Sequence, residues 1–349
     1  MRKRVSIKDV AREAGVSVTT TSYVLNQKST GRISEETAQK VLKVAERLNY
    51  VPNISARTMI SQKSQLIGAI IPQTGSSRRL MFDNPFYGEF LSAVESEVRE
   101  RGYHLLVSGT GPNQDYSSIA QMRNLDGIII LGTYHCEYLD EIKKTGIPVV
   151  LVDAYVQDHY FHTVSINDRH GGYLATKYLV EKGHRKIAFV AEKLRGQGVY
   201  EQRFLGYCDA LTEAGLRFDE ASVYATDVSY YGSFQVAEEF VQRNNGETAA
   251  FVAADIMALG FINGLGALNW SVPDDLSVIG FDDVYLATMC LPEITTVHQD
   301  ISEKGRQAVD IVIKAMEDKN KRDVILPLHI VERGSVKNHV ALEDKKYAR

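Results

Sequence analysis

Residues 6–26 read SIKDVAREAGVSVTTTSYVLN, and this stretch decides the fold at the N-terminal end of the chain. Ser6, with Asp9 three residues later, is a helix-start signal, and the apolar residues that follow recur at the spacing of one buried helical face. Gly15 ends this first helix, because helices commonly stop at a residue that can adopt a positive φ. Ser17 caps a second helix. The pattern predicts a helix-turn-helix of the size and polarity that enter the major groove of DNA.

The second helix has one apolar side and one polar side. Val24 and Leu25 form the apolar side. The outward residues are small or polar enough to meet base edges and phosphates: Thr19, Thr20, Ser22 and Tyr23. A third helix over residues 34–48 is expected to complete a small core with Val41, Leu42, Ala45 and Leu48. The alternative is a three-helix bundle without a nucleic-acid role.

Charge is distributed unevenly along the 349 residues and favours the DNA-binding interpretation. The whole chain has 40 Lys and Arg against 44 Asp and Glu, a net charge of −4. The first 63 residues hold 12 basic and 5 acidic residues, which leaves 28 against 39 for the rest. A basic head neutralises phosphates, while an acidic body does not adhere to DNA by itself.

Short motifs follow one another in a characteristic order. The N-terminal ones are IKDVA at 7–11, GVS at 15–17, LN at 25–26, AERLNY at 45–50 with Pro52, and AR at 56–57. The later ones are NPFY at 84–87, GIP at 146–148, GH at 183–184, RFLG at 203–206, IGFDD at 279–283, and TTV at 295–297 with QD at 299–300. In this combination and order the chain resembles the LacI/GalR family of bacterial transcription regulators over nearly its whole length.

Beyond Gln65, apolar runs typical of strands alternate with longer helical patterns, which indicates parallel α/β winding. The expected fold class is therefore α/β: a small all-α helix-turn-helix head and a two-lobed, doubly wound body resembling periplasmic sugar-binding proteins. The expected boundaries are 1–50 for the DNA-binding domain and 51–64 for a hinge helix and linker. The N-terminal lobe is assigned 65–163 plus 294–322, the C-terminal lobe 164–293 plus 323–338, and the polar tail 339–349. The return crossings of the chain are implied by the resemblance.

The hinge is too short to be a stable helix alone, so we expect it to fold against a partner or DNA. The resemblance implies that two hinge helices pair in a dimer and insert an apolar side chain into the minor groove, a place that falls on Met59. The alternative is that Met59 only packs against its dimer mate. The full set of predicted DNA-contacting residues is Ser6, Ser17, Val18, Thr19, Thr20, Tyr23, Asn26, Ala56 and Met59.

Polar residues follow the apolar runs of the body, at the ends of strands where doubly wound sheets bind ligands. They include Asp153, Asp255, Asp282 and Asp283. Carboxylates and a guanidinium beside aromatic walls suit a sugar or another polar small molecule. The resemblance assigns Asp282 and Arg203 to effector binding, with Phe86 and Tyr87 as walls from the other lobe. Alternatives without a ligand stay open. Asp282 can instead cap a loop, and Arg203 can form a surface ion pair. Asp283 can have a cap or turn role, and Phe86 can be a core residue.

The sequence departs from the family pattern at three positions, which leaves the ligand open. Ala254 stands where the family usually has Asn, Val228 where it has a stacking aromatic, and residues 167–168 are Asn-Asp rather than Asp-Asn. Tyr230 or Tyr231 is the candidate to replace the missing ring. The predicted effector-binding residues are Phe86, Tyr87, Arg203, Tyr230, Asp255 and Asp282.

Other classes find little support in the sequence. Cys136, Cys208 and Cys290 have no metal or redox spacing, and His159, His162 and His170 match no ligand pattern, so neither a metal nor a cofactor is expected. The sequence shows no nucleophile elbow or phosphate loop, so we expect no enzyme. It lacks an export signal and an apolar run of membrane-spanning length, which predicts a cytoplasmic location.

These observations predict a homodimeric repressor that binds palindromic operator DNA and responds to a small effector, a carbohydrate. A tetramer is not expected, because residues 335–349 lack leucine heptads. The alternatives are a corepressor-dependent or activating regulator, a soluble sugar-binding protein, or an enzyme.

Overall fold

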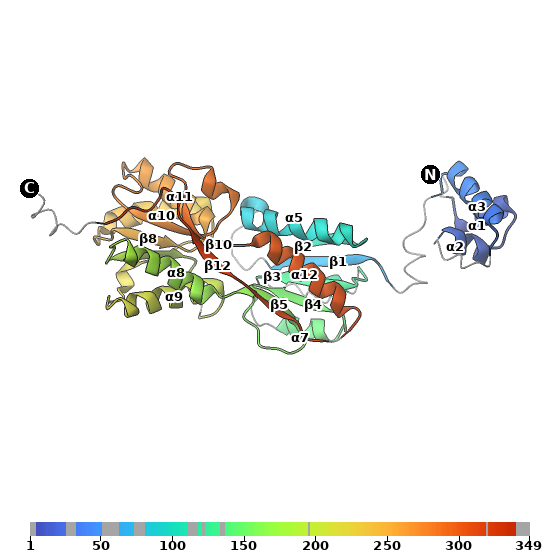
Figure 1. The fold of residues 1–349 in the computed structure, drawn as a ribbon, viewed down its shortest axis with the longest axis horizontal. Helices are drawn as coiled ribbons and strands as arrows, with labels where there is room; N and C mark the ends of the chain where they lie inside the picture. Colours follow the sequence, from blue (N-terminus) through green and yellow to red (C-terminus); the bar gives the residue numbers. More distant parts are fainter. Residues whose placement is uncertain are drawn as a thin grey trace, which may run out of the picture. The chain divides into compact units, whose positions relative to one another are not determined.

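The computed structural model describes residues 5–25, 33–50, 63–72, 81–110, 118–120, 123–132, 137–194, 196–318 and 320–339, with backbone alone at 137 and 138. The chain divides into two compact units, Met1–Ser64 and Gln65–Arg349. We call the first unit the head and the second the body, and each is described by itself (Figure 1).

Three helices build the described part of the head: α1 (Ile7–Ala14), α2 (Val18–Leu25) and α3 (Glu35–Arg47). Ser6 and Asp9 form a capping box at the start of α1, and Gly15 ends it in the left-handed region at φ 67°. The helices enclose a small apolar core that consists of Val10, Ala14, Val24, Val41, Val44 and Ala45. The predicted helix-turn-helix is confirmed.

One core residue of the head was predicted wrongly. Leu42 is 51% exposed, and Val44 is buried in its place. The inward stripe of α3 follows the i, i+3, i+4 spacing of a helical face, which from Val41 leads to Val44 and Ala45. Leu42 lies one residue beyond Val41 and therefore points away from this stripe.

The first lobe of the body is a six-stranded parallel sheet in the order β11-β5-β4-β3-β1-β2. Helices α5 and α12 cover one face of this sheet and α7 covers the other. The elements are β1 (Leu66–Pro72), η1 (Met81–Asp83), α5 (Pro85–Glu100), β2 (His104–Thr110), β3 (Gly127–Leu131), α7 (Glu137–Lys143), β4 (Val149–Val152), β5 (His162–Ile166), α12 (Ile301–Ala315) and β11 (Asp323–Leu326).

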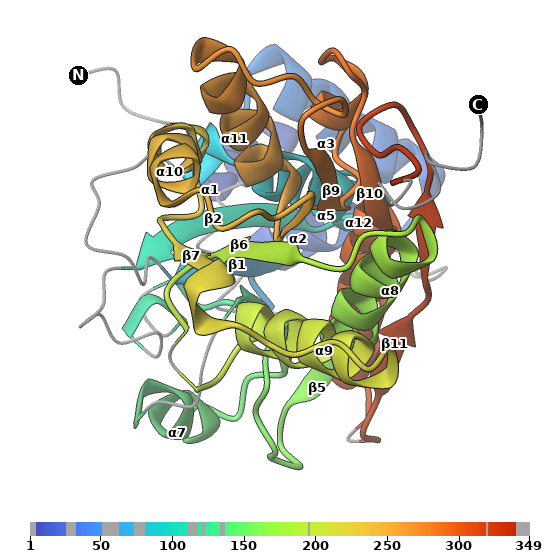
Figure 2. The same cartoon turned by 90° about the vertical axis from the view of Figure 1, so that its left-hand side faces the viewer.

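The second lobe repeats this plan in the order β12-β10-β9-β8-β6-β7, with β12 antiparallel to β10. Figure 2 shows α8 and α9 side by side on one face of the sheet and α10 and α11 on the other. The elements are α8 (Asp168–Glu181), β6 (Ile187–Ala191), α9 (Val199–Glu213), η2 (Glu220–Ser222), β7 (Val223–Ala225), α10 (Tyr230–Arg243), β8 (Ala249–Val252), α11 (Asp255–Ala267), β9 (Ser277–Asp282), η3 (Tyr285–Thr288), β10 (Thr295–Gln299) and β12 (Leu328–Val331).

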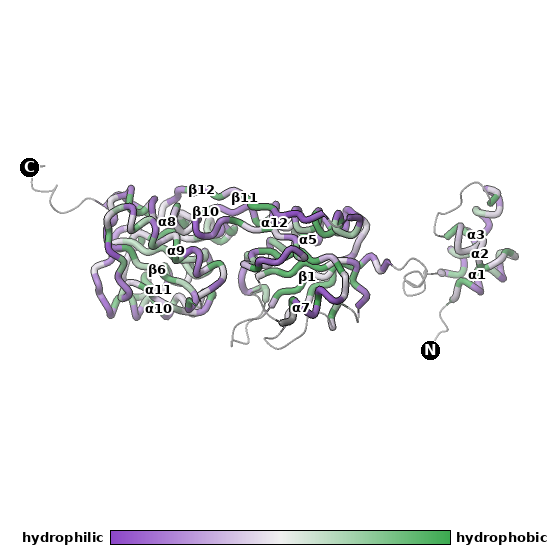
Figure 3. Tube along the Cα trace, turned by 90° about the horizontal axis from the view of Figure 1, so that it is seen from below, coloured by the Kyte–Doolittle hydropathy of each residue, from purple (hydrophilic) through white to green (hydrophobic). Residues whose placement is uncertain are grey.

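Both faces of each sheet are buried, which explains why the central strands are continuous apolar runs. In β6, Ile187 and Phe189 pack toward α8 and α9, whereas Ala188 and Val190 pack toward α10 and α11. Successive side chains of a strand point to opposite faces, so a strand covered by helices on both sides is apolar throughout. In Figure 3 the hydrophobic segments accordingly lie inside each lobe.

The chain passes between the lobes three times: from β5 into α8, from β10 into α12, and from β11 into β12 (Figure 1). The predicted lobe boundaries are therefore wrong at three strands. β5 and β11 pair with each other in the first sheet, although residues 164–166 and 323–326 were assigned to the second lobe. β10 pairs with β9 in the second sheet, although it was assigned to the first.

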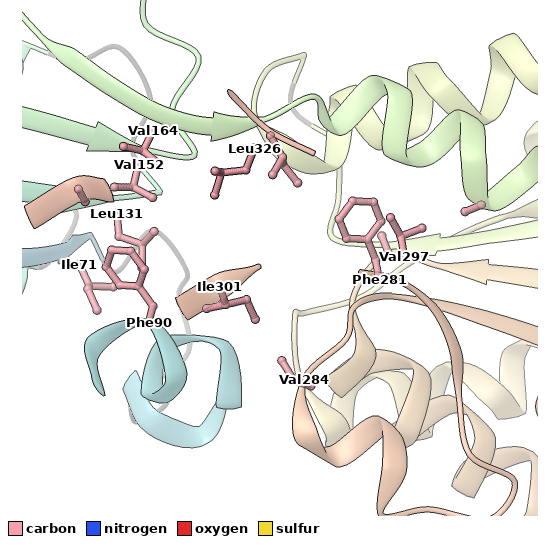
Figure 4. Packing of buried hydrophobic residues seen from close by; sticks show 14 of the residues in the cluster. Ile71, Phe90, Leu131, Val152, Val164, Phe281, Val284, Val297, Ile301 and Leu326 are labelled. Atoms are coloured by element: carbon pink, nitrogen blue, oxygen red, sulfur yellow. The ribbon is translucent and has the colours of Figure 1, made fainter. Parts of the chain in front are cut away.

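Apolar packing continues along these crossings. Figure 4 shows Phe90 and Val152 among the core residues of the first lobe and Phe281 and Val297 in the second, with Ile301 and Leu326 between the two groups. The crossings are thus packed segments and place the ends of both sheets near each other. Among the described helices, none combines the length and apolarity needed to cross a bilayer.

Candidate DNA-reading helix and interlobe polar cluster

The second helix of the head is held by its own polar residues. The hydroxyl oxygen of Ser17 accepts a hydrogen bond from the backbone N–H of Thr20 at 3.0 Å, which caps the start of α2. Thr21 is buried and donates from Oγ1 to the carbonyl oxygen of Ser17. Thr21, which sequence reasoning did not single out, therefore belongs to the core side of the helix.

The opposite side of α2 is open to solvent. Val18 and Thr19 are exposed, Thr20 is half-buried, and the Tyr23 side chain is 49% exposed. Ser6 is also exposed, but its hydroxyl and backbone N–H are engaged with Asp9. The predicted base-contacting residues Val18, Thr19 and Tyr23 thus lie on the exposed side of α2. The predicted contacts Asn26, Ala56 and Met59 lie outside the described residues.

In the body, two glycines bring α8 and α9 into backbone contact. A Cβ atom at Gly172 would lie 2.0 Å from the carbonyl oxygen of Arg203, and one at Gly206 would lie 1.9 Å from that of Arg169. Only glycine fits such an approach. The close packing places Arg203, on α9, beside the first residue of α8, Asp168.

Arg203 is buried, with 4% exposure, and is satisfied by several partners. Its Nε donates to Oδ1 of Asp168 at 2.8 Å, and its Nη1 donates to the carbonyl oxygen of Ala253 at 2.6 Å. Nη1 also lies 3.6 Å from Oδ1 of Asp282, and the guanidinium lies 3.6 Å from the centre of the Phe281 ring. A surface ion pair, the alternative for Arg203, does not fit this burial.

A second buried cation approaches from the first lobe. Lys304, in the first turn of α12, donates from Nζ to both oxygens of Asp153 and to Oε1 of Gln299. Gln299 in turn donates from Nε2 to Oδ1 of Asp282 at 2.6 Å. Tyr155 of the first lobe donates to Oδ2 of Asp168 at 2.8 Å.

We call these residues the interlobe cluster; it comprises Asp153, Tyr155, Asp168, Arg203, Asp282, Gln299 and Lys304. Hydrogen bonds connect its members across the lobes at two places, Lys304 to Gln299 and Tyr155 to Asp168. Most members stand at or just after the carboxyl ends of strands, where ligands of doubly wound sheets bind. Asp282 has φ 116°, a sparsely populated conformation of the kind found at functional sites.

Burial changes the acidity of the cluster. It raises the pKa of Asp282 to about 6, although nearby Arg203 favours the ionised form. Burial likewise raises the pKa of Asp168, again opposed by Arg203. Three carboxylates therefore share two cations, and their remaining oxygen lone pairs can accept hydrogen bonds from ligand hydroxyls.

The structure places the other predicted effector residues differently. Asp255 is fully buried, and its oxygens accept from Thr296 Oγ1 at 2.7 Å and from the backbone N–H of Val284 at 3.1 Å. This geometry fits a structural role. Tyr230, on α10, accepts a hydrogen bond from Asn263 and packs against Tyr231. These contacts lie on the α10 and α11 side of the sheet and involve no member of the cluster.

The aromatic pair of the first lobe lies closer to the cluster. Phe86 and Tyr87 are half-buried in the first turn of α5 and pack edge to face at 5.8 Å. Nζ of Lys304 lies 5.5 Å from the centre of the Phe86 ring.

Asp283, the neighbour of Asp282, lies outside the cluster. Its carboxylate accepts a hydrogen bond from Arg333 at 2.5 Å, and its φ of 63° agrees with the alternative turn role.

Lys304 and Tyr155 were missed by sequence reasoning. A signal for Lys304 was present: Ile301, Gly305 and Ala308 share its helical face and are buried, so Lys304 is a lone charge in an apolar stripe. Because burying an unpaired charge is costly, such a lysine predicts a buried acidic partner elsewhere in the chain.

Comparisons with protein families agree with this architecture. Residues 6–53 match the model described as "Bacterial regulatory proteins, lacI family", and residues 176–336 match "Periplasmic binding protein-like domain". The chain is 34% identical to the HTH-type transcriptional repressor PurR of Vibrio atlanticus, over 95% of this chain and 98% of that protein. It is also 34% identical to catabolite control protein A of Priestia megaterium, over 95% and 99%.

Solved structures show the same likeness. The lac repressor dimer bound to operator and the anti-inducer ONPF superposes with a TM-score of 0.84 at 26% identity, covering 96% of this chain and all of that one. A complex of the transcriptional regulator CelR with cellobiose gives a TM-score of 0.71 at 26% identity, over 95% of this chain and all of that one.

Proposed function

Because the chain belongs to the LacI family of bacterial transcription regulators, we propose that it is a repressor whose interlobe cluster binds a small polar effector, a carbohydrate. The observation that carries this proposal is the arrangement of Arg203 between Asp168 and Asp282 at the ends of the strands. Carboxylates and a guanidinium in this arrangement can accept from and donate to several hydroxyls of one ligand.

The neighbouring rings support a sugar. Phe86 and Tyr87 come from the first lobe, whereas Arg203 and Asp282 come from the second. A ligand that touches both groups changes the relative free energies of the lobe arrangements, since it gains contacts only in the arrangement that brings both groups to it. Effector binding can in this way control the DNA affinity of the head.

For DNA, we propose that the exposed side of α2 reads the operator with Val18, Thr19, Thr20 and Tyr23, while Ser6, Ser17 and Asn26 contact phosphates. Ala56 and Met59 are proposed as minor-groove contacts. A palindromic operator requires two heads one or more helical turns apart, so the proposed species is a homodimer. The lac repressor dimer bound to operator supports this arrangement. We propose that the protein acts in the cytoplasm, where operator DNA is found.

A thermal-unfolding screen tests the effector site. Cellobiose, ribose, other sugars, sugar phosphates, nucleosides and amino acids are added to the full chain and to Asp282→Asn. A ligand at a hundred times its dissociation constant should stabilise the wild type by about 2.7 kcal/mol, and Asp282→Asn should lose most of this gain. Asp209→Asn, which changes an exposed carboxylate paired with Arg169, is the control and should keep the gain.

A ligand that stabilises Asp282→Asn as strongly as the wild type binds elsewhere, and the proposed site is then wrong. With a ligand identified, the same two proteins are compared for operator binding with and without it. Release of DNA by the ligand indicates an inducer, and tighter binding indicates a corepressor. Incubation with the ligand should yield no product, because a sensor binds without turnover.

A further inference from the structure

The second lobe carries a cavity of about 310 Å³ at the opposite end of its sheet from the interlobe cluster. Ile187, the first residue of β6, lines it, whereas the cluster stands at the carboxyl ends of β8 and β9. The floor also includes Tyr207 and Leu211 of α9, and basic side chains from the adjoining loops complete the wall: Arg185, Lys186 and Arg217. Its volume lies at the lower end of the range for small-molecule sites.

Two of these basic residues differ from most arginines of the body. Described arginines typically pair with a carboxylate, as at Arg99, Arg101, Arg169, Arg203, Arg243, Arg306, Arg322 and Arg333. Arg185 and Arg217 are exposed and form no ion pair among the described residues. Two unpaired guanidinium groups beside one cavity of an acidic body leave their donors available to an anion.

The acidic groups near the cavity are already engaged. Asp219, in the lining, accepts from the backbone N–H of Ala221 at 2.9 Å and caps η2. Glu247 is buried behind Ser222 and accepts from its hydroxyl at 2.9 Å. The lining itself therefore has three cations against one carboxylate. Lys186 donates to the carbonyl oxygen of Asn245.

We propose that this cavity is a second ligand site, which binds a small phosphomonoester. The planar guanidinium forks of Arg185 and Arg217 hold the phosphate by paired hydrogen bonds. The organic part lies against the lining from Tyr207 and Leu211. The Tyr207 hydroxyl donates to the carbonyl oxygen of Ile187 at 2.8 Å and is therefore not available to the ligand. The site is distinct from the interlobe cluster, although α9 carries both Tyr207 and Arg203.

Isothermal titration of the full chain with ribose 5-phosphate, inorganic phosphate and ribose, at one ionic strength, tests the proposal. Ribose 5-phosphate and inorganic phosphate should bind with saturation, and ribose should not compete with them. The variant Arg185→Ala/Arg217→Ala should weaken both by about tenfold or more, since each loses charge-assisted hydrogen bonds. Arg99→Ala/Arg169→Ala removes the same charge from paired sites and should bind like the wild type.

Three results would overturn the proposal. An equal loss in both double variants means a general charge effect. If raising the chloride concentration abolishes phosphate binding equally in the wild type and in Arg185→Ala/Arg217→Ala, the phosphate is an adventitious ion only. Binding lost in Asp282→Asn but kept in Arg185→Ala/Arg217→Ala means that phosphate occupies the interlobe cluster. The last result also separates this inference from the proposed effector site, which stands or falls with Asp282.

Discussion

Lys304 donates hydrogen bonds to both carboxylate oxygens of Asp153, at 2.7 and 2.8 Å, from a side chain with no solvent exposure. The pair lies within the first lobe, yet Lys304 also reaches Gln299 at the end of a strand of the second. A buried ammonium is tolerated only when its donors are satisfied, so these acceptors fix the position of α12. The proposed effector site and the lobe crossing at β10–α12 thus share one side chain.

Lys304→Met should destabilise the body by about 3–5 kcal/mol, because it leaves Asp153 as a buried, unpaired carboxylate. Adding Asp153→Asn should restore part of the loss, and Asn tolerates the φ of 51° at this position. The measurement is urea unfolding at neutral pH. Lys314→Met, on the same helix but in an exposed pair with Asp310, should cost no more than about 1 kcal/mol. Equal losses in the single and double variants would contradict the pairing.

Asp282 should make stability depend on pH. Its pKa is raised to about 6 in the folded protein, compared with about 3.9 in an unfolded chain. The folded state therefore binds the proton more tightly, so the contribution is fully present below about pH 4 and is lost as the pH rises through about 6. A difference of two pKa units corresponds to roughly 3 kcal/mol.

Asp282→Asn keeps an oxygen for Gln299 but cannot ionise, so it isolates this contribution. Between pH 4 and pH 7 the wild type should lose about 3 kcal/mol of unfolding free energy relative to the variant. Urea titrations of both proteins at intervals across this range provide the measurement. A difference that stays constant with pH would show that Asp282 titrates normally.

Gly206→Ala should separate α8 from α9, because its Cβ would lie 1.9 Å from the Arg169 carbonyl oxygen. We expect a loss of about 1–3 kcal/mol from overpacking, together with a loss of the effector response as Arg203 moves away from Asp168. Gly266→Ala, near the end of α11 with no atom within 4 Å of the added Cβ, should be neutral or slightly stabilising. Thermal unfolding with and without ligand compares the two. If both variants behave alike, the close packing is not required.

The elements of the fold were largely predictable, because their signals are local. The capping box at Ser6 and Asp9, and the glycine at 15, depend on residues a few positions apart. The assignment of strands to lobes was not predictable in this way. β5 (HTVSI), β10 (TTVHQ) and β11 (DVIL) are short strands of mixed polarity, and their residues fit either sheet. Only their pairing partners decide the lobe.

The sequence marked only part of the interlobe cluster: motifs marked Arg203 and Asp282, and a strand end marked Asp153. Arg203 and Asp282 lie in motifs of the family, and the structure brings them within 3.6 Å of each other. Lys304 lies in no such motif, and Asp153, its partner, precedes it by 151 residues. The apolar stripe of α12 indicates that Lys304 is buried. Spacing along the chain carries no information about a contact across 151 residues, so the partner of Lys304 became visible only in the folded structure.

Dimerisation should depend on the loop after β9. Tyr285, Met289 and Leu291 are exposed apolar residues in this loop, and the Leu291 side chain is 93% exposed. Contiguous exposed apolar side chains commonly mark an interface. Leu291→Asp should shift the protein toward monomers in sedimentation velocity at micromolar concentration, whereas Ile325→Asp, on the edge strand β11, should remain dimeric. A wild-type monomer, or a Leu291→Asp dimer of unchanged stability, would argue against this surface.

Tyr23 should contribute to operator specificity, since it is the exposed aromatic residue of α2 and carries one phenolic hydroxyl. Tyr23→Ala should reduce the preference at one or two base pairs by about 1–3 kcal/mol each, and Tyr23→Phe should show how much of this comes from the hydroxyl. Lys8→Ala removes an exposed charge outside α2 and should weaken binding to all sequences alike. Gel-shift titrations on operator and scrambled duplexes at one salt concentration distinguish these effects. If Tyr23→Ala weakens both duplexes equally, Tyr23 contacts the backbone and does not read bases.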